Sequence, residues 1–463
     1  MTLRAIRACA ICLAAAVPAL TSCSGDEVGV PVVGTGGGGA SSGSTGAGAP
    51  GAGTAGVAGT LGGSGGAGAA PSGSAGAGGA TGGSAGAAGG SAGQGTAGGF
   101  VAGGAGGAPM VPPLDCGGKG AVIENHGPTT NRVNYVIVGD GYSDAELDTT
   151  FITHIQTAMT KRFSDPIGQV YLRYRKFVNI CALKVPSTPI CGSSTFGCCG
   201  DDSSRLARCN NTAVNNAIRD NLPATFEVDW RALVLNGSSW WNTGAQLMLW
   251  SGGNRDAAGA ALHEGGHGFH QLADEYANCG SQWVNNSSDN QTSGGKWNAW
   301  IDYMQTPGTG RQGFFACQGG SNYRPTDNSM MNSLFGNDPD TSFNAVSREK
   351  MIMDIWRIIA NPWDSVVPPA GAVTSPTSLA VNVIDPTVIN VDWSVDGNMV
   401  AINGGPVYNI GAANLAPGTH MVTARAYDNA GMDLVRQTTG MSYNRQYWSM
   451  NASKTVTWTV TIP

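Results

Sequence analysis

The chain has 463 residues and a formal net charge of −6 at pH 7, and only 12% of its residues are charged. No run rich in lysine and arginine occurs, so we expect no nucleic-acid partner. Residues 34–109 contain 34 of the 71 glycines and no charged residue. About 350 residues are left for folded structure, which is enough for roughly two domains.

The first residues are typical of an export signal. A basic start is followed by the apolar run 8–20, which is too short to span a membrane as a mature helix. LTSC at 20–23 is similar to a bacterial lipobox, in which Cys23 is lipidated and becomes the new N-terminus. We therefore expect a lipoprotein signal peptide over 1–22. The alternative is an ordinary secretory signal followed by a chance cysteine.

The residues after Cys23 predict where the protein goes. Ser24, and not an aspartate, follows Cys23, which in lipoproteins of two-membrane bacteria usually directs transfer to the outer membrane. We expect an exported monomer held by a lipid anchor at the outer membrane or cell surface, or released from it. Residues 23–112 then form a Gly/Ala/Ser-rich disordered tether, because this composition cannot bury enough apolar surface to offset the entropy of ordering.

Strand and helix patterns alternate after the tether. Residues 133–138 (VNYVIV) predict a buried strand, and Ser143 with Glu146 forms a capping-box signature for a helix that reaches about Arg162. This order indicates an α/β or α+β domain with a central sheet, over 113–365. Further strands are predicted at 176–185, 230–237 and 246–253, and helices from near Asp256 and at 342–359.

Eight cysteines remain after the export signal, an even number that suits disulfides in an exported protein. Cys279 and Cys317 lie at the two ends of a long irregular region, and we expect them to bond to each other. The adjacent Cys198 and Cys199 need separate partners. A cysteine metal cluster is the alternative, but the sequence has no CxxC pair.

Residues 366–463 have a different pattern. Short segments alternate like half-buried strands, with DG and NGG turn signals between them. We expect an all-β, immunoglobulin-like sandwich without a disulfide, in which Trp393 is the core tryptophan. The predicted strands are SLAVNVID, INVDWSVDG, GTHMVTARAYDNAG and TVTWTVTIP.

A candidate metal site lies in LHEGGHGFHQLADEY, residues 262–276. On an α-helix His263 and His267 share one face and can bind one Zn²⁺. Zinc lowers the pKa of a bound water, and Glu264 can take its proton as the water attacks a peptide carbonyl. The five-residue pattern also fits a solvated helix face with incidental histidines. Three of the six histidines fall within eight residues, however, which favours a metal.

The third ligand must come from beyond His267. His270 and Asp274 would each lie about 10 Å further along an unbroken helix, so either can reach the zinc only if the chain turns back. The three glycines within 265–268 weaken a helix by up to ~1 kcal/mol each. We expect them to let the backbone turn and deliver Asp274.

HEGGHGFHQLADEY resembles the long motif of the IgA-peptidase family, or igalysins, which are metzincin-like bacterial zinc endopeptidases. The C-terminal strands are similar to a β domain often attached to this family. The resemblance covers most of 115–463 in scattered blocks and implies an α+β, zincin-like fold with a mixed sheet and an active-site helix. The other blocks are VGDGYSDAE at 138–146, KW at 296–297, YRPTDNSMMN at 323–332 and FNAVSRE at 343–349.

The resemblance also implies roles for individual residues. His263 and His267 would bind zinc, Glu264 would be the general base, and the third ligand would be acidic. Asp274 is our choice for the third ligand, and Glu275 and His270 are the alternatives. The motif departs from the metzincin pattern, because the glycine usually found three residues after the second histidine is His270 here. The usual third-ligand position is Ala273, so the spacing to Asp274 is one residue longer.

Two further expectations follow from the family blocks. Met331, with Met330 as the alternative, would form the Met-turn, an apolar floor beneath the metal. Tyr276 and Tyr323 are candidate oxyanion stabilisers.

The chain is therefore expected to be a surface-anchored zinc endopeptidase with protein or peptide substrates. The alternatives are a non-catalytic binding lipoprotein that keeps the peptidase fold, and a metal hydrolase of cell-wall peptides. Glu264 argues against a binding module, which has no need of it. We expect an extended substrate to pair with an edge strand near 246–250 and to contact the loop 278–328. Nothing in the sequence indicates immunoglobulin A as the substrate.

Overall fold

A computed structural model describes residues 113–164, 169–244, 247–276, 279–280, 283–290, 296–306, 308–333, 342–436 and 445–463. The predicted signal peptide, Cys23 and the predicted tether lie outside these residues. All described residues fall in one compact unit. Among the described helices, none has the length and apolar character that a membrane span needs.

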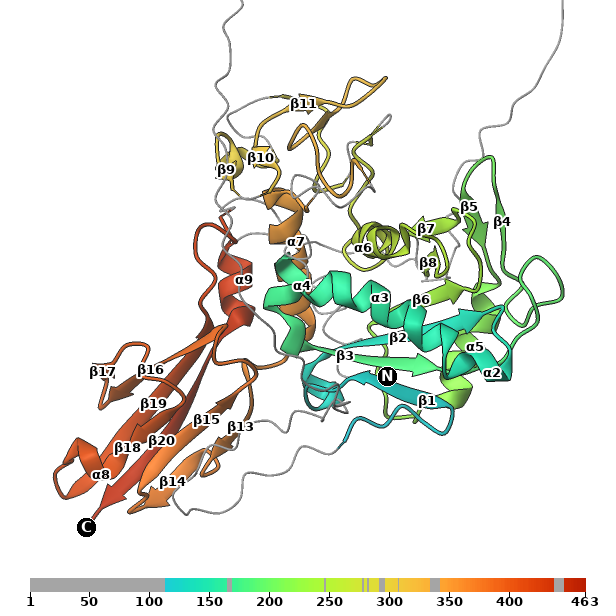
Figure 1. The fold of residues 1–463 in the computed structure, drawn as a ribbon. Coiled ribbons are helices and arrows are strands. Elements are labelled where there is room, and N and C mark those ends of the chain that lie inside the picture. Colours follow the sequence, from blue (N-terminus) through green and yellow to red (C-terminus); the bar gives the residue numbers. More distant parts are fainter. Residues whose placement is uncertain are drawn as a thin grey trace, which may run out of the picture. The chain divides into compact units, whose positions relative to one another are not determined.

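The centre of the first part is a mixed eight-stranded sheet with the order β1-β3-β2-β6-β8-β7-β5-β4 (Figure 1). The neighbours β3, β2, β6 and β8 run parallel. Strands β1, β7 and β4 pair antiparallel with β3, β8 and β5. The strands are β1 (Gly120–Glu124), β2 (Val133–Asp140), β3 (Val178–Leu183), β4 (Cys199–Asp201), β5 (Leu206–Arg208), β6 (Trp230–Leu235), β7 (Asn242–Gly244) and β8 (Met248–Ser251).

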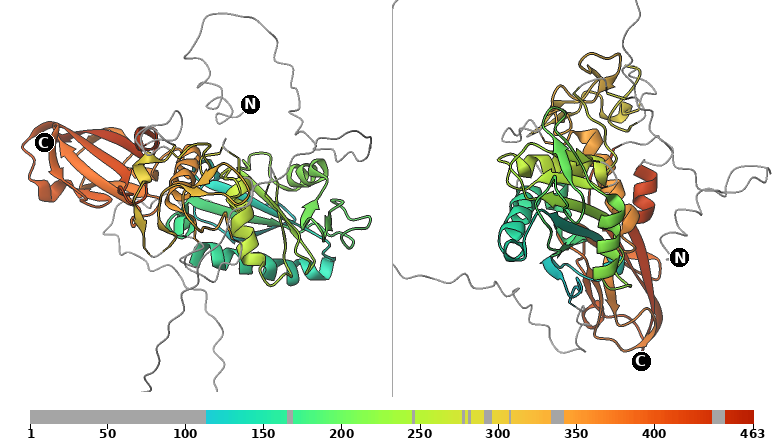
Figure 2. Two further views of the ribbon diagram at one scale, coloured as in Figure 1. Left: turned by 90° about the horizontal axis from the view of Figure 1, so that it is seen from above. Right: turned by 90° about the vertical axis from the view of Figure 1, so that its right-hand side faces the viewer.

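Helices cover both faces of this sheet, as Figures 1 and 2 show. Tyr135 and Ile137 of β2 belong to one buried cluster together with helices α3 (Thr150–Ser164) and α6 (Ala257–Gly268). The alternate residues Val136 and Val138 pack with helix α5 (Asn211–Asn221). Because both faces are covered, β2 is buried along its whole length, which explains its nearly continuous apolar run.

The helix predicted from Ser143 to about Arg162 is two helices. The capping box of Ser143 and Glu146 is present, but it opens only the short α2 (Asp144–Leu147). The chain leaves the helix at Asp148 and Thr149, residue types whose side chains compete for backbone groups, and α3 then begins. The remaining helices of this part are α4 (Gln169–Arg173) and α7 (Ala345–Ile358), with short 3₁₀ turns η2 (Thr129–Asn131), η4 (Arg175–Phe177) and η5 (Asn298–Trp300).

Four disulfides join the eight cysteines after the export signal. The predicted Cys279–Cys317 bond is confirmed, and it closes the irregular region after helix α6. That region contains two small ladders, β9 (Met304–Gln305) with β10 (Gly310–Arg311) and β11 (Phe315–Ala316) with β12 (Tyr323–Arg324). The other three bonds are Cys116–Cys181, Cys191–Cys199 and Cys198–Cys209.

The C-terminal residues form two β-sheets, which we call the β unit. A three-stranded sheet has the order β13-β15-β18, and a five-stranded sheet has the order β14-β20-β19-β16-β17. The short helices α8 (Ile410–Ala413) and α9 (Arg445–Ala452) connect some of these strands. The strands are β13 (Trp363–Val367), β14 (Gly371–Thr374), β15 (Ser378–Val383), β16 (Ile389–Val395), β17 (Asn398–Ala401), β18 (Val407–Asn409), β19 (Gly418–Asp428) and β20 (Ser453–Ile462).

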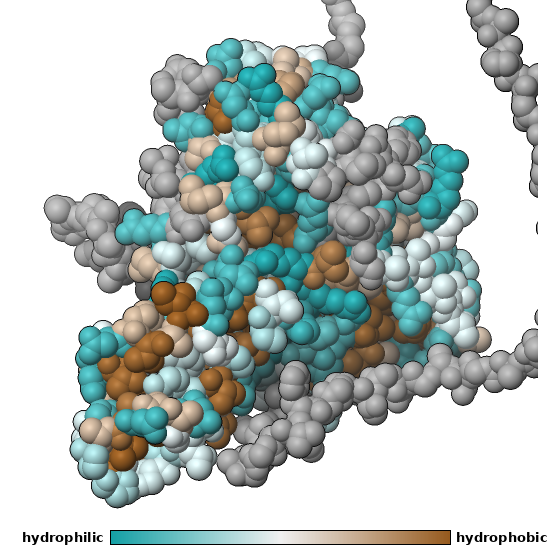
Figure 3. All heavy atoms as spheres, turned by 60° about the vertical axis from the view of Figure 1, so that its left-hand side comes forward, coloured by the Kyte–Doolittle hydropathy of each residue, from teal (hydrophilic) through white to brown (hydrophobic). Residues whose placement is uncertain are grey.

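The β unit has its own aromatic centre. Trp393 is fully buried and stacks on Trp458 and Tyr408, with ring centroids 5.9 Å and 5.3 Å away. Figure 3 shows apolar residues in brown on its surface, and Met399 and Ile402 are among its exposed side chains. The presence of two sheets agrees with the expected sandwich, while the immunoglobulin-like class stays a prediction.

One buried carboxylate ties the β unit to the first part. Asp428 at the end of β19 accepts hydrogen bonds from the Tyr174 hydroxyl, from Trp356 Nε1 at 2.7 Å and from Arg173 at 2.7 Å. The apolar residues of both parts also belong to one continuous buried cluster. Strand β13 begins at Trp363, before the predicted boundary between 365 and 366. The two predicted domains therefore share packing.

Candidate metal centre

Helix α6 carries the HExxH motif and ends in a sharp turn. Asp256 occupies the position before its first residue, and the last helical residue is Gly268. Gln271 then takes a left-handed conformation with φ 53°, and its N–H donates to the His267 carbonyl over 3.0 Å. This is the left-handed type of C-cap, which reverses the direction of the chain. The expectation that the chain leaves the helix and turns back is confirmed.

Two of the three glycines of the motif serve a different purpose from the one expected. Gly265 and Gly266 are helical, so the prediction that they bend the backbone is wrong. A Cβ on Gly265 would lie 2.9 Å from Arg162 Nη2, and a Cβ on Gly266 would lie 2.6 Å from Met331 Sδ. These glycines let neighbouring side chains pack directly against the helix backbone.

The turn brings three ligand-type atoms together. His263 Nε2 lies 3.0 Å from His267 Nε2, and Asp274 Oδ1 lies 3.1 Å from each of them. Among the described residues, these three form the one group of acidic, histidine or cysteine side chains that could hold a metal ion. The turn residue and the carboxylate are both displaced by one position from the metzincin pattern, to 271 and 274. The longer spacing noted in the sequence is therefore accounted for.

The hydrogen bonds of the two imidazoles fix their tautomers. His263 Nδ1 lies 2.8 Å from the Met330 carbonyl, and His267 Nδ1 lies 2.6 Å from the Leu272 carbonyl. A carbonyl only accepts, so each Nδ1 carries the proton and each neutral ring presents a bare lone pair at Nε2. When both rings are neutral, two lone pairs and the Asp274 carboxylate face one another. This arrangement is repulsive by itself and fits a bound cation.

The distances and donor types agree with zinc. An ion held about 2.0–2.1 Å from two imidazole nitrogens and a carboxylate oxygen fits acceptors that lie 3.0–3.1 Å apart. Three protein ligands with one open position are typical of catalytic zinc sites.

The ionisable groups are strongly coupled. Burial alone would lower the pKa of His267, but the hydrogen bond and charge of Asp274 and the charge of Glu264 raise it to about 9. Burial alone would raise the pKa of Asp274, yet the two histidines lower it. Burial raises the pKa of Glu264, against the charges of both histidines. The carboxylates of Asp274 and Glu264 therefore favour a positive charge at this cluster.

The two other candidates for the third ligand point elsewhere. His270 is fully buried beneath the helix, and its Nδ1 lies 3.1 Å from Asp354 of α7. Glu275 is also fully buried, and its carboxylate accepts hydrogen bonds from Ser329 and Asn344. Neither side chain joins the cluster.

The two methionines contribute in different ways. Met331 is fully buried, with its sulfur against Gly266 beneath the helix. Its carbonyl accepts from the Glu275 N–H at 2.8 Å, which ties it to the residue after Asp274. The Met330 side chain is also buried, and its carbonyl orients His263. Met331 therefore packs against the helix that carries the motif, while its role as a floor beneath the metal stays a prediction.

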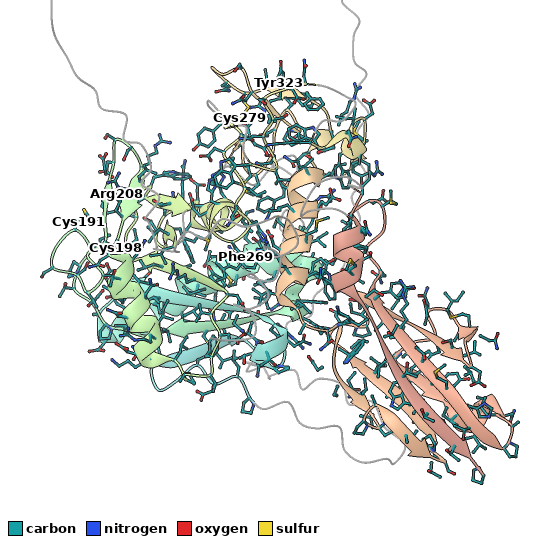
Figure 4. All side chains as sticks on the ribbon, turned by 180° about the vertical axis from the view of Figure 1, so that it is seen from behind. Cys191, Cys198, Arg208, Phe269, Cys279 and Tyr323 are labelled. Carbon is teal, nitrogen blue, oxygen red and sulfur yellow. A yellow bond between two sulfur atoms is a disulfide. The ribbon has the colours of Figure 1, made fainter. Side chains whose placement is uncertain are left out.

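The cluster opens into a pocket of about 710 Å³. Glu264 and Tyr276 line it together with the three ligand-type residues, whereas Tyr323 does not. Figure 4 shows Phe269 near the centre, with Cys279 and Tyr323 in the loop above it and Arg208 in a separate hairpin to the left. Of the two candidate oxyanion stabilisers, only Tyr276 lies at the site.

The position of the edge strand was predicted wrongly. Within 246–253, the residues Met248–Ser251 form β8, which is an inner strand between β6 and β7. The short β7 is the next strand of the sheet, between β8 and β5, and its Gly244 comes close to helix α6. A Cβ on Gly244 would be 2.4 Å from His267 Cβ and 2.6 Å from Glu264 Oε2. Three polar or small residues give no strand signal, so the sequence could not reveal this approach.

A helical HExxH pair, a returning carboxylate and an open pocket define the site expected of a metal-dependent peptidase. Residues 121–312 match the family model described as IgA Peptidase M64. The resemblance expected from the sequence is confirmed over these residues. The match includes helix α6 and Asp274 and ends before Met331. A protein or peptide substrate follows from the family.

The other comparisons add little. No curated protein matches the chain. A solved structure of Clostridium thermocellum CbhA fibronectin(III)-like modules is 13% identical, with a TM-score of 0.14, and the match covers 21% of this chain and 93% of that chain. A likeness this weak assigns no fold to any part of the chain.

Proposed function

We propose that the protein is a zinc-dependent endopeptidase whose metal is held by His263, His267 and Asp274. The proposal rests on three acceptor atoms that lie close together, one from Asp274 and two from imidazole rings. Each ring donates its Nδ1 proton to a backbone carbonyl, which leaves Nε2 as an acceptor. A bound zinc ion would supply Lewis acidity, which lowers the pKa of water and polarises a carbonyl.

Glu264 is proposed to be the general base. It follows His263 on the helix, is 6% exposed and lines the pocket. Its pKa is raised by burial, which suits a carboxylate that takes a proton from the attacking water and later gives it to the leaving amine.

Tyr276 is proposed to donate a hydrogen bond to the developing oxyanion. It is 42% exposed and its ring lies 6.5 Å from that of His263. Burial and the nearby Asp274 raise its pKa, so the hydroxyl keeps its proton.

Internal cleavage is supported by the lining of the pocket. No lysine or arginine occurs among the described lining residues, and such a cation is what a carboxypeptidase needs for the terminal carboxylate. The open pocket instead suits a chain that continues on both sides of the cleaved bond.

The test is a casein or gelatin digest with zinc-loaded wild type and Glu264→Gln, together with zinc content per chain. We expect about one zinc in both proteins and cleavage by the wild type alone. Cleavage that survives Glu264→Gln would remove the proposed mechanism. A zinc-loaded wild type that cleaves no protein would favour the binding lipoprotein or the cell-wall peptide hydrolase.

Surface anchoring is a separate proposal that rests on the LTSC sequence and Cys23. Metabolic labelling with a fatty acid should mark the wild type and fail to mark Cys23→Ala, which should leave the membrane fraction. Equal labelling of both proteins would refute the anchor.

A further inference from the structure

Exposed apolar side chains gather around the candidate catalytic pocket. Leu206 is 49% exposed, Tyr276 42% and Trp283 37%, and all three line it. They come from separate segments, a hairpin before helix α6 and the loop after it. Large apolar side chains that stay exposed around one cavity indicate a surface that binds an apolar group.

Leu206 is held in place by the hairpin of β4 and β5. The next residue, Ala207, points to the opposite side and is buried, while the Cys198–Cys209 bond fixes the hairpin. The Arg205 carbonyl accepts from the Asn242 N–H, which attaches the hairpin to β7 beside the helix. Leu206 is therefore exposed on a rigid element and not on a free loop.

Trp283 is fixed from the other segment. The Cys279–Cys317 bond anchors the chain just before it. Lys296 Nζ donates to the Trp283 carbonyl at 2.8 Å and to the Asn286 carbonyl at 2.7 Å. This lysine is thereby directed to main-chain oxygens, and it does not line the pocket.

Among the described lining residues of the pocket, no charged group is left to pair with an ionic side chain of the substrate. Among its described lining residues, the carboxylates are Glu264 and Asp274, and both are assigned to the metal and the base. A substrate carboxylate or ammonium group beside Leu206 or Trp283 would lose water without gaining a partner.

We propose that the peptidase selects a large apolar side chain next to the cleaved bond, and that this side chain packs against Leu206 and Trp283. The proposal rests on the proposed function, since it names the substrate class of the same site. The catalytic groups and the selecting groups are separate residues, so each can be changed alone.

The test is a digest of a proteome-derived peptide library by the zinc-loaded full chain, with cleavage sites mapped by mass spectrometry. We expect Leu, Ile, Val, Met, Phe, Tyr or Trp at one flanking position, favoured about tenfold or more over Asp, Glu and Lys. Leu206→Asp should reduce this preference and admit Lys or Arg. Trp283→Ala should reduce it without admitting a cation.

Val122→Asp is the matched control. Val122 has the same 49% exposure, lies on the edge strand β1 and does not line the pocket. Its cleavage profile should equal that of the wild type. A wild-type profile indifferent to side-chain type, or one that neither Leu206→Asp nor Trp283→Ala alters, overturns the proposal.

The variant Glu264→Gln shows whether a negative result refutes the apolar selection alone or the proposed function as well. Cleavage that disappears in Glu264→Gln but shows no apolar preference refutes only the selection by Leu206 and Trp283. Cleavage that persists in Glu264→Gln, or a wild type that cleaves nothing, refutes the proposed function and this inference with it.

Discussion

His267 and His270 lie close together in the sequence and each contacts an aspartate, but the two contacts have opposite surroundings. His267 and Asp274 face a pocket beside a second imidazole, and the pKa of His267 is raised to about 9. His270 pairs with Asp354 in the core beneath the helix, and burial there lowers its pKa to about 4 despite the aspartate. The residue types are the same, so location decides which pair can serve a metal and which serves packing.

The reason lies in what surrounds each ring. Phe269 and Trp230 pack around His270, with ring centroids 4.6 Å and 6.3 Å away. The hydrogen-bond partners of His267 Nε2 in the described part of the chain are His263 Nε2 and Asp274 Oδ1. The turn at Gln271 separates the two environments, because it places Asp274 on the pocket side.

The largest effect is expected at the base. Glu264→Gln should lower kcat by about 10²–10⁴-fold, the range for loss of a general base, while zinc binding is retained. Peptide hydrolysis and zinc content measured on the same sample check this. A variant with full zinc and near-normal kcat would contradict the role of Glu264.

The next effect distinguishes the two aspartates directly. Asp274→Ala should weaken zinc binding by about a hundredfold or more, since it removes one of three proposed ligands. Asp354→Asn is the control, and it should leave zinc affinity within a few-fold of wild type. Competition with a chromophoric chelator measures both. Equal losses in the two variants would contradict the separation.

A smaller effect is expected where β7 approaches the helix. Gly244→Ala should lower kcat/KM by about tenfold, because its Cβ would lie 2.4 Å from His267 Cβ and 2.6 Å from Glu264 Oε2 and displace both side chains. Gly118→Ala should have no effect, since a Cβ there meets nothing within 4 Å. Steady-state kinetics with one peptide substrate checks the pair.

The last prediction concerns the pH dependence of stability. Because the folded pKa of His270 is about 4, below the value of about 6.5 for an exposed histidine, the unfolded chain binds the extra proton first. Stability should fall as pH decreases from about 6.5 to about 4, by at most about 1.4 kcal/mol per pH unit. Urea unfolding of wild type and His270→Gln should show a shallower pH dependence in the variant. Identical slopes would contradict the assignment.

Parts of this organisation follow from the sequence and parts depend on the tertiary structure. The continuous apolar run of β2 and the motif of α6 gave clear local signals. The left-handed turn falls on Gln271, a residue type with no special preference for it, so no local signal places the turn at this residue.

The walls of the pocket could not be predicted. Leu206 precedes the helix by more than 50 residues and lies on a three-residue strand without an alternating pattern. Gly244 belongs to another such strand. The packing of Gly266 on Met331 likewise depends on contacts distant in sequence, and a local pattern shows only a weakened helix.

The most direct test of the central claim is X-ray diffraction at the zinc absorption edge from crystals of the zinc-loaded chain. Our account predicts one anomalous peak, about 2.0–2.1 Å from Nε2 of His263 and of His267 and about 2.0–2.2 Å from a carboxylate oxygen of Asp274. A peak beside His270 or Glu275, or no peak between the two imidazoles, would contradict it.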